Sequence, residues 1–166
     1  MRESERQRIF DDWMRRHRGL MLKVVRAWAF APDDQEDLFQ EVALQLWQSI
    51  PNYRADAAET TWLYRVALYT AFAWNRRERK HSSGHLPLDG MEHTLRATPA
   101  VRDDRLDWLY REIAELGEVD RSVMLLMLDG HSYREMSDIL GISESNVGVR
   151  IHRIRKRFAA KAIEGV

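Results

Sequence analysis

Apolar side chains recur three and four residues apart along most of the chain, and alternation with a period of two is nearly absent. Helical geometry places residues with this spacing on one face, so the sequence predicts an all-α protein. The first helix is expected over about residues 4–29, either continuous or broken near Gly19, with Trp13 and Trp28 on its apolar face. Pro32 ends this helix because a proline disfavours helical geometry in the residue before it.

Two more helices are expected after the first. Asp33 or Asp34 would cap the second helix, and Pro51 would end it. The third helix would span about residues 62–79. Its inward face is expected to contain Trp62, Val66, Ala67, Thr70, Ala73 and Trp74. Three long helices with short connections can bury a common core, so residues 1–80 are expected to form one domain.

The periodic pattern fails after the third helix. Residues 81–102 contain Ser, Gly and Pro without a sustained period, so a flexible linker is expected there. Helical spacing resumes in residues 103–166. One helix would end at Gly117, and the next would be capped by Asp120 and end at Gly130. With the two helices that follow, this part of the chain predicts a second domain of four helices.

Residues 132–158 have the pattern of a helix-turn-helix. Gly141 supplies the backbone freedom of the turn, and Ser143 can cap the second helix. One face of that helix is apolar, and its basic residues lie away from this face: Arg150, Arg153, Lys156 and Arg157. In a helix-turn-helix protein the second helix enters the major groove of DNA. The alternative is an ordinary helical hairpin with a solvated basic face.

The distribution of charge and the composition restrict the functions that this chain can have. The chain has 166 residues and a formal net charge of zero, but an acidic stretch covers residues 33–41 and a basic cluster covers residues 76–80. A chain with separate surfaces of this kind can bind DNA through its basic surface and a basic protein surface through its acidic one. The absence of cysteine excludes a disulfide framework and thiolate metal sites. Without a membrane-length apolar run or a signal-peptide core, the chain is expected to be soluble and cytoplasmic.

Four segments carry a family resemblance. They are DDQEDLFQEVALQLWQ at residues 33–48, TWLYRVAL at 61–68, the basic run at 76–80 and DRSVMLLMLDGHSYREMSDILGIS at 120–143. In this order they resemble the sigma factors of bacterial RNA polymerase, in the extracytoplasmic-function (ECF) subfamily of the sigma-70 family. The resemblance implies a region 2-like helical domain and a region 4-like helix-turn-helix domain, joined by a flexible linker. It implies a promoter-specificity subunit that is not an enzyme and needs no cofactor or metal.

The resemblance also assigns contacts. Asp37, Gln40 and Glu41 would bind the polymerase core, whose largest-subunit clamp helices and flap are the family's docking sites. The −10 promoter element would meet Tyr53, Arg54, Trp62, Tyr64, Arg65, Tyr69, Arg76 and Arg77. The −35 element would meet Ser145, Asn146, Val149, Arg150, Arg153, Lys156 and Arg157. These residue types suit the task, since aromatic rings stack on unpaired bases and arginine pairs with guanine in the major groove.

The chain departs from the family pattern at Tyr69 and Gly148, and also at Phe72 and Ala73, where relatives often have polar or charged residues. Most relatives have an asparagine where this chain has Tyr69, which could stack on a base instead. Relatives have a longer polar or basic side chain in place of Gly148, where a close approach to the backbone would account for glycine. Trp62 and Trp74 suit either the hydrophobic core or the DNA interface, and the core is favoured for both.

Two other functions fit parts of the sequence. A stand-alone helix-turn-helix regulator would bind duplex DNA as a dimer, but it gives no reason for the acidic helix and the aromatic, basic helix after it. An enzyme could use His81, His85 and His93, or the carboxylates near Asp37. The sequence has no HExxH motif, no paired His–carboxylate spacing and no glycine-rich phosphate loop. A third hypothesis modifies the sigma factor prediction: an anti-sigma partner could cover both domains and hold the protein inactive.

Overall fold

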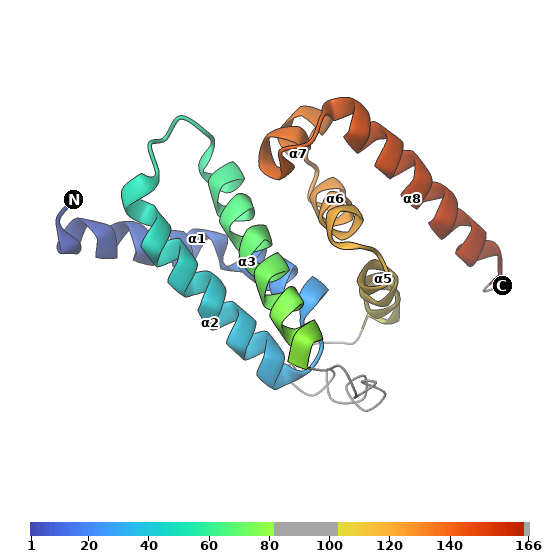
Figure 1. Cartoon of the computed structure of the whole chain (residues 1–166), viewed down its shortest axis with the longest axis horizontal. Helices are drawn as coiled ribbons and strands as arrows, with labels where there is room; N and C mark the ends of the chain where they lie inside the picture. The colour runs from blue at the N-terminus through green and yellow to red at the C-terminus, as the bar shows by residue number, and fades with distance from the viewer. Residues whose placement is uncertain (82–102, 165–166) are drawn as a thin grey trace. The chain divides into compact units, whose positions relative to one another are not determined.

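The computed structural model describes residues 1–81 and 103–164 of the chain. Within these ranges every regular element is a helix, so the all-α prediction is confirmed (Figure 1). The chain divides into two compact units, Met1–Val101 and Arg102–Val166, called the first and the second unit below. Apart from residue 81, the expected linker lies outside the described residues, and so do His85 and His93.

The first unit consists of three long helices: α1 (Glu3–Trp28), α2 (Pro32–Ser49) and α3 (Glu59–His81). A short 3-10 helix, η1 (Ile50–Asn52), follows α2, and each long helix packs on the other two (Figure 1). The helix α1 is continuous through Gly19. Large side chains fill the core, and the fully buried ones include Trp13, Met21, Trp28, Leu38, Leu46, Leu63, Tyr64 and Leu68. Burial of this much apolar surface is the main stabilising contribution in the first unit.

The prediction that Asp33 or Asp34 caps α2 is wrong. The helix starts at Pro32, with Ala31 as the N-cap residue, and no side chain caps it. Proline suits the first helical position because its missing N–H would have no partner there anyway. Asp33 and Asp34 therefore lie inside the first turn, where their negative charges face the positive end of the helix dipole.

The second unit contains α5 (Asp104–Ala114), α6 (Glu118–Leu128), α7 (Tyr133–Leu140) and α8 (Glu144–Glu164). The helix α8 packs on α6 and α7, and α5 packs on α6 (Figure 1). Gly130 and Gly141 have φ angles of 82° and 70°, so the turns before α7 and α8 use a conformation that favours glycine. Apolar residues from all four helices form the core, including Ile113, Val123, Leu126, Met136, Ile139, Val147, Ile151 and Ile154.

The junction between α5 and α6 differs from the prediction. The helix α5 ends at Ala114, before Gly117, and Gly117 is the N-cap residue of α6. Asp120 is therefore the third residue of α6 and does not cap it. The end of α5 is held by Arg121, which is only 5% exposed and donates hydrogen bonds to the carbonyl oxygens of Ala114 (2.6 Å) and Leu116 (3.0 Å). This buried arginine satisfies the carbonyl of Ala114, the last residue of α5, and that of Leu116 in the turn that follows.

No helix in residues 1–81 and 103–164 is both long and apolar enough to span a lipid bilayer. No group of three or more histidine, aspartate and glutamate side chains in the same ranges could hold a metal ion.

Candidate nucleic-acid interface

The helix-turn-helix of the second unit is built from local hydrogen bonds. Ser132 and Glu135 form a capping box at the start of α7: the Ser132 hydroxyl accepts from the Glu135 N–H at 3.1 Å, and the Glu135 carboxylate accepts from the Ser132 N–H at 3.4 Å. Gly141 ends α7 in the left-handed conformation. The Ser143 hydroxyl then accepts a hydrogen bond from the Asn146 N–H at 3.0 Å, so the predicted cap of α8 is confirmed.

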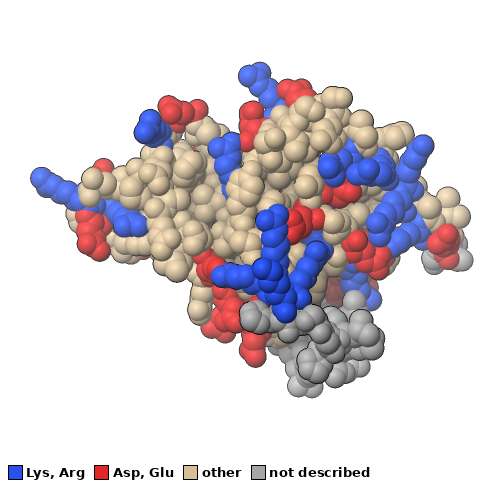
Figure 2. Space-filling model, viewed as in Figure 1, with Lys and Arg blue, Asp and Glu red and all other residues tan. Residues whose placement is uncertain are grey.

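The helix α8 has one buried face and one exposed face. Val147, Ile151 and Ile154 are buried, as their spacing predicted. Six residues of the expected −35 set lie exposed, away from this buried face: Ser145, Asn146, Val149, Arg153, Lys156 and Arg157. Figure 2 shows lysine and arginine side chains gathered along this helix. Val149 is 62% exposed, and its apolar side chain would suit contact with a thymine methyl group.

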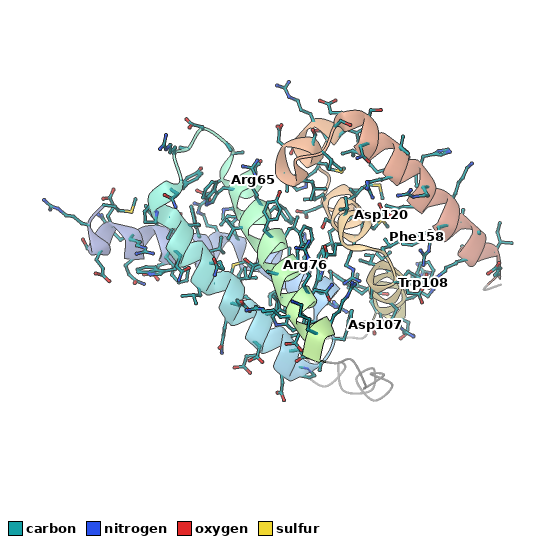
Figure 3. All side chains as sticks on the ribbon, viewed as in Figure 1. Arg65, Arg76, Asp107, Trp108, Asp120 and Phe158 are labelled. Atoms are coloured by element: carbon teal, nitrogen blue, oxygen red, sulfur yellow. The ribbon has the colours of Figure 1, made fainter. Side chains whose placement is uncertain are left out.

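Arg150 is half-buried because its guanidinium contacts two neighbouring side chains. Its Nη1 donates to Oδ1 of Asp120 at 2.7 Å, and its Nε donates to Oδ1 of Asn146 at 2.9 Å. Arg153 donates to the same carboxylate, at 3.2 Å from Oδ2. Asp120 thus contacts two arginines of α8 and is labelled in Figure 3. The sequence had predicted it only as a cap of α6.

Ion pairs join the C-terminal half of α8 to α5. Lys161 contacts Glu112 at 2.5 Å and Glu115 at 2.6 Å, and Arg157 contacts Glu115 at 3.3 Å. The hydrogen bond from Lys161 holds the pKa of Glu115 below its ordinary value. Trp108 and Phe158 pack together beside these pairs, with ring centroids 6.3 Å apart (Figure 3). Arg157, expected to bind phosphate, therefore also helps to attach α8 to α5.

A tyrosine ring lies beside Gly148. The Cε2 atom of Tyr133 would be 3.5 Å from a Cβ atom at that position, which is an ordinary van der Waals contact. An alanine would fit, but a longer side chain would have to turn away from the ring. Tyr133 is 44% exposed and comes from the start of α7. This position next to α8 makes Tyr133 a candidate interface residue that the sequence did not reveal.

The acidic face of α2 is the candidate protein-binding surface of the first unit. Asp37 and Gln40 are exposed, and Glu41 is half-buried and forms an ion pair with Arg77 of α3. Asp34, one turn before Asp37, has a pKa raised above its ordinary value, first by burial and then by the charges of its acidic neighbours.

A groove runs between α2 and α3. Its walls include Gln45 and Gln48 from α2 and Arg65, Tyr69 and Ala73 from α3. Tyr69 is 51% exposed and contacts the ring of Phe72 edge-on, with centroids 5.8 Å apart. An exposed aromatic ring beside an arginine and several amide groups offers both stacking and hydrogen-bonding partners to a base.

One residue of the expected −10 set is buried and cannot contact DNA. Tyr64 is 1% exposed and belongs to the core, so its ring cannot reach a nucleic acid. Trp74 is also buried, as favoured from the sequence, whereas Trp62 is half-buried and donates its indole N–H to the Ser49 hydroxyl at 3.1 Å. The ring of Tyr53 lies 5.4 Å from Trp13 and 5.7 Å from Trp62.

The remaining residues of that set lie at the surface or close to it. Tyr53 anchors the loop before α3, and its hydroxyl donates to the carbonyl oxygen of Ala57 at 3.3 Å. Arg54 is exposed in this loop, Arg65 is half-buried, and Arg76 and Arg77 are exposed near the end of α3. The structure therefore brings Trp62, Arg65 and Tyr69 together along the groove, while the basic run lies further along the same helix.

Comparison with known proteins identifies the family. The family model described as Sigma-70 region 2 matches residues 13–81, and the one described as Sigma-70, region 4 matches residues 106–158. The ECF RNA polymerase sigma-E factor of Escherichia coli K12 is 30% identical over 144 residues, which is 77% of this chain and 73% of the relative. The chain belongs to the ECF sigma factors. Its function is therefore that of a promoter-specificity factor, and the stand-alone regulator is not favoured.

Further sigma factors agree with this assignment. The ECF RNA polymerase sigma factor SigM of Mycobacterium tuberculosis is 25% identical over 151 residues, which cover 90% of this chain and 75% of SigM. Among solved structures, CnrH in complex with the cytosolic domain of CnrY has a TM-score of 0.70 at 21% identity, covering 96% of this sigma factor and 91% of CnrH. The sigma factor RpoE in complex with the anti-sigma factor NepR from Bartonella quintana has the same TM-score at 17% identity, covering 89% and 92%. These two likenesses show a shared fold, and sigma factors in general are not enzymes.

Proposed function

We propose that this sigma factor divides promoter recognition between its two units, with α8 on the −35 element and α3 with its preceding loop on the −10 element. The observation that carries this division is the contrast between the two basic helices. The helix α8 presents polar and basic side chains from a capped helix-turn-helix, which suits duplex DNA. The helix α3 lines a groove with an exposed aromatic ring, which suits unpaired bases.

The −35 contacts are ranked by how each side chain is held. Arg150 is fixed by two hydrogen bonds and is the proposed reader of a base edge. Ser145, Asn146 and Val149 lie near it on the same exposed side, while Arg153 and Lys156 are suited to phosphate contacts. Arg157 has a smaller share because Glu115 already binds its guanidinium.

The −10 contacts are proposed along the groove and beyond it. Tyr69 would stack on an unpaired base, with Arg65 beside it in the groove wall. Arg54, Arg76 and Arg77 would neutralise phosphates of the same strand. Tyr53 and Trp62 would act by holding the loop before α3 in place, because their rings pack on each other and the ring of Tyr53 also packs on Trp13.

Core polymerase would bind the acidic face of α2 through Asp37, Gln40 and Glu41, with the clamp helices of its largest subunit as the docking site and a further contact at the flap. As a polymerase subunit, the protein would act in the cytoplasm, without enzymatic activity or a cofactor of its own. The printed descriptions of the two solved relatives name complexes with CnrY and NepR, and an inhibitory protein partner is proposed for this chain by analogy.

Run-off transcription with purified core polymerase tests the proposal. The chain should bind core and direct initiation from a promoter obtained by selection with the complex. Replacing Asp37, Gln40 and Glu41 together by alanine should abolish core binding, while Glu5→Ala on the exposed surface of α1 should not. Failure of the unmodified chain to bind core would overturn the proposed function.

A further inference from the structure

Asp120 is an acidic residue in direct contact with Arg150, the proposed base-reading side chain. Its carboxylate accepts from Arg150 at 2.7 Å and from Arg153 at 3.2 and 3.3 Å, and its own side chain is only 19% exposed. Arg150 and Arg153 lie 30 and 33 positions after Asp120 in the sequence, so these bonds join α6 to α8. A carboxylate at a DNA interface repels phosphates and weakens binding to any sequence. Its presence beside two arginines therefore calls for a reason other than affinity.

The bonds at Arg150 leave most of its guanidinium available. A guanidinium has five N–H donors, and the bonds to Asp120 and Asn146 use two of them. The other donors can reach the two acceptors of a guanine edge while the first two hold the group in one orientation. A side chain that is already ordered loses less conformational entropy when it binds.

The same bonds fix the amide of Asn146. Because its Oδ1 accepts from Arg150, the amide group offers its Nδ2 donor to the groove. The two-bond pair with adenine needs both an acceptor and a donor, and here Arg150 already occupies one of the two lone pairs of Oδ1, which disfavours that pair. Arg150 and Asn146 together thus present donors to DNA, and donors match the N7 and O6 acceptors of guanine.

We propose that Asp120 is a positioning residue for specificity: it holds Arg150, and through Arg150 the amide of Asn146, so that α8 selects guanine edges in the −35 element. This inference rests on the proposed function of α8. The charge of Asp120 lowers the affinity for every duplex. It lowers the affinity for wrong duplexes more, because Arg150 held by Asp120 cannot turn to the nearest phosphate, as it could if it were released.

The test compares two carboxylates that contact the same helix. The complex of the full chain with core polymerase first selects duplexes from a randomised −35 library. Binding of the selected duplex and of a shuffled duplex of equal composition is then measured by fluorescence anisotropy for the wild type, Asp120→Asn and Glu115→Gln. Glu115 is the matched control because it also pairs with an arginine of α8, in the C-terminal half of the helix.

In Asp120→Asn the ratio of selected to shuffled affinity should fall at least about fivefold, the low end of the discrimination given by one bidentate arginine–guanine pair. Glu115→Gln should leave this ratio unchanged. In an Arg150→Ala background, Asp120→Asn should have no further effect on the ratio, because Asp120 acts through Arg150. A second variant, Asp120→Glu, moves the carboxylate by one methylene and should also lower the ratio if the asparagine variant does not fold.

Three results would overturn the inference. The ratio could stay within about twofold of the wild type in both Asp120 variants, which would leave Asp120 with a charge effect only. The ratio could change equally with and without Arg150, which would separate the two residues. If the wild-type complex selects no sequence at all, the proposed function of α8 fails and this inference fails with it; an intact selection with an unchanged ratio rejects the role of Asp120 alone.

Discussion

The two units hold their basic surfaces in different ways. In the first unit the arginines and the lysine of residues 76–80 lie exposed near the end of α3, beyond a core of large apolar side chains. In the second unit the core includes a buried arginine, Arg121, and the carboxylates of Glu112 in α5 and Asp120 in α6 contact basic residues of α8. Charge is thus mainly a surface property of the first unit and a part of the packing in the second.

This contrast matches two kinds of DNA contact. An exposed arginine can adapt to phosphates along a strand whose path is not fixed, and this contact carries no sequence information. An arginine held by neighbours, as Arg150 is, has its donors aimed before DNA arrives and suits a base edge in a duplex. Under the proposed function, the same residue type would serve affinity in the first unit and specificity in the second.

Arg121→Met should give the largest effect. The substitution keeps an apolar stem but removes the bonds that end α5, and hydrogen bonds to a charged group are worth about 1.5–3 kcal/mol. The second unit should lose about 2–4 kcal/mol of its free energy of unfolding. Hydrogen exchange measured by mass spectrometry on peptides of α5 and α6 would report this loss.

Arg6→Met is the matched variant in the first unit. Arg6 of α1 likewise binds a carbonyl near the end of another helix, α2: its Nε and Nη2 donate to the carbonyl oxygen of Trp47 at 2.9 and 2.7 Å. Arg6 is only half-buried, however, and α2 packs on a core of large apolar side chains. Its loss should cost about 1 kcal/mol. Equal losses for the two variants would contradict the view that the second unit depends more on buried charge.

Arg150→Ala tests the held arginine of the second unit. Discrimination between a selected and a shuffled −35 duplex should fall by about 1–3 kcal/mol, because one bidentate base contact is lost. Binding to core polymerase should stay unchanged, and Arg111→Ala on α5 should affect neither quantity. Loss of core binding in Arg150→Ala would argue against the assigned division of labour.

Arg76→Ala tests the exposed basic run of the first unit. Affinity for promoter DNA with a single-stranded −10 region should fall for every sequence alike. The slope of log K against log salt concentration should decrease by about 0.7, the value expected for one phosphate contact on a single strand. Arg8→Ala, an exposed arginine of α1, should leave the slope unchanged. A loss confined to one −10 sequence would make Arg76 a base reader instead.

Local signals in the sequence predicted local structure well. The turn at Gly141 and the cap at Ser143 depend on residues within three positions of each other, and both are present. Asp33, Asp34 and Asp120 were predicted as caps because aspartate often has that role. The sequence could not show that Asp120 has partners 30 and 33 positions away.

The inward face of α3 shows a second limit of the sequence. Ala67, Thr70 and Trp74 of the predicted face are buried, but Trp62 and Val66 are only half-buried and Ala73 is exposed. Four residues that the prediction left out are fully buried: Leu63, Tyr64, Leu68 and Ala71. A shift of one residue turns a helical face by about 100°, since a turn holds 3.6 residues. Both faces of α3 are apolar enough for a core, so only the packing against α1 and α2 decides which one is inward. This choice buried Tyr64 and left Tyr69 exposed in the candidate site.

Asp34→Asn should give the smallest effect and has a pH dependence of known sign. The pKa of Asp34 is raised in the folded state, so its contribution to stability is present below the unfolded pKa and is lost as the pH rises through the folded pKa. At neutral pH the ionised carboxylate therefore destabilises the first unit. Removing the charge should raise the free energy of unfolding by no more than about 0.5 kcal/mol, and this gain should vanish in acid.

Asp33→Asn is the control that isolates burial. Asp33 is exposed in the same helical turn, so its loss removes the same charge and the same interaction with the helix dipole. Tryptophan fluorescence during thermal unfolding reports mainly the first unit, which contains five of the six tryptophans. A gain of equal size in both variants would assign the effect to mutual repulsion within the acidic face. A gain in Asp34→Asn alone, with weaker binding to core polymerase, would mean that this face retains a buried charge for binding at a cost in stability.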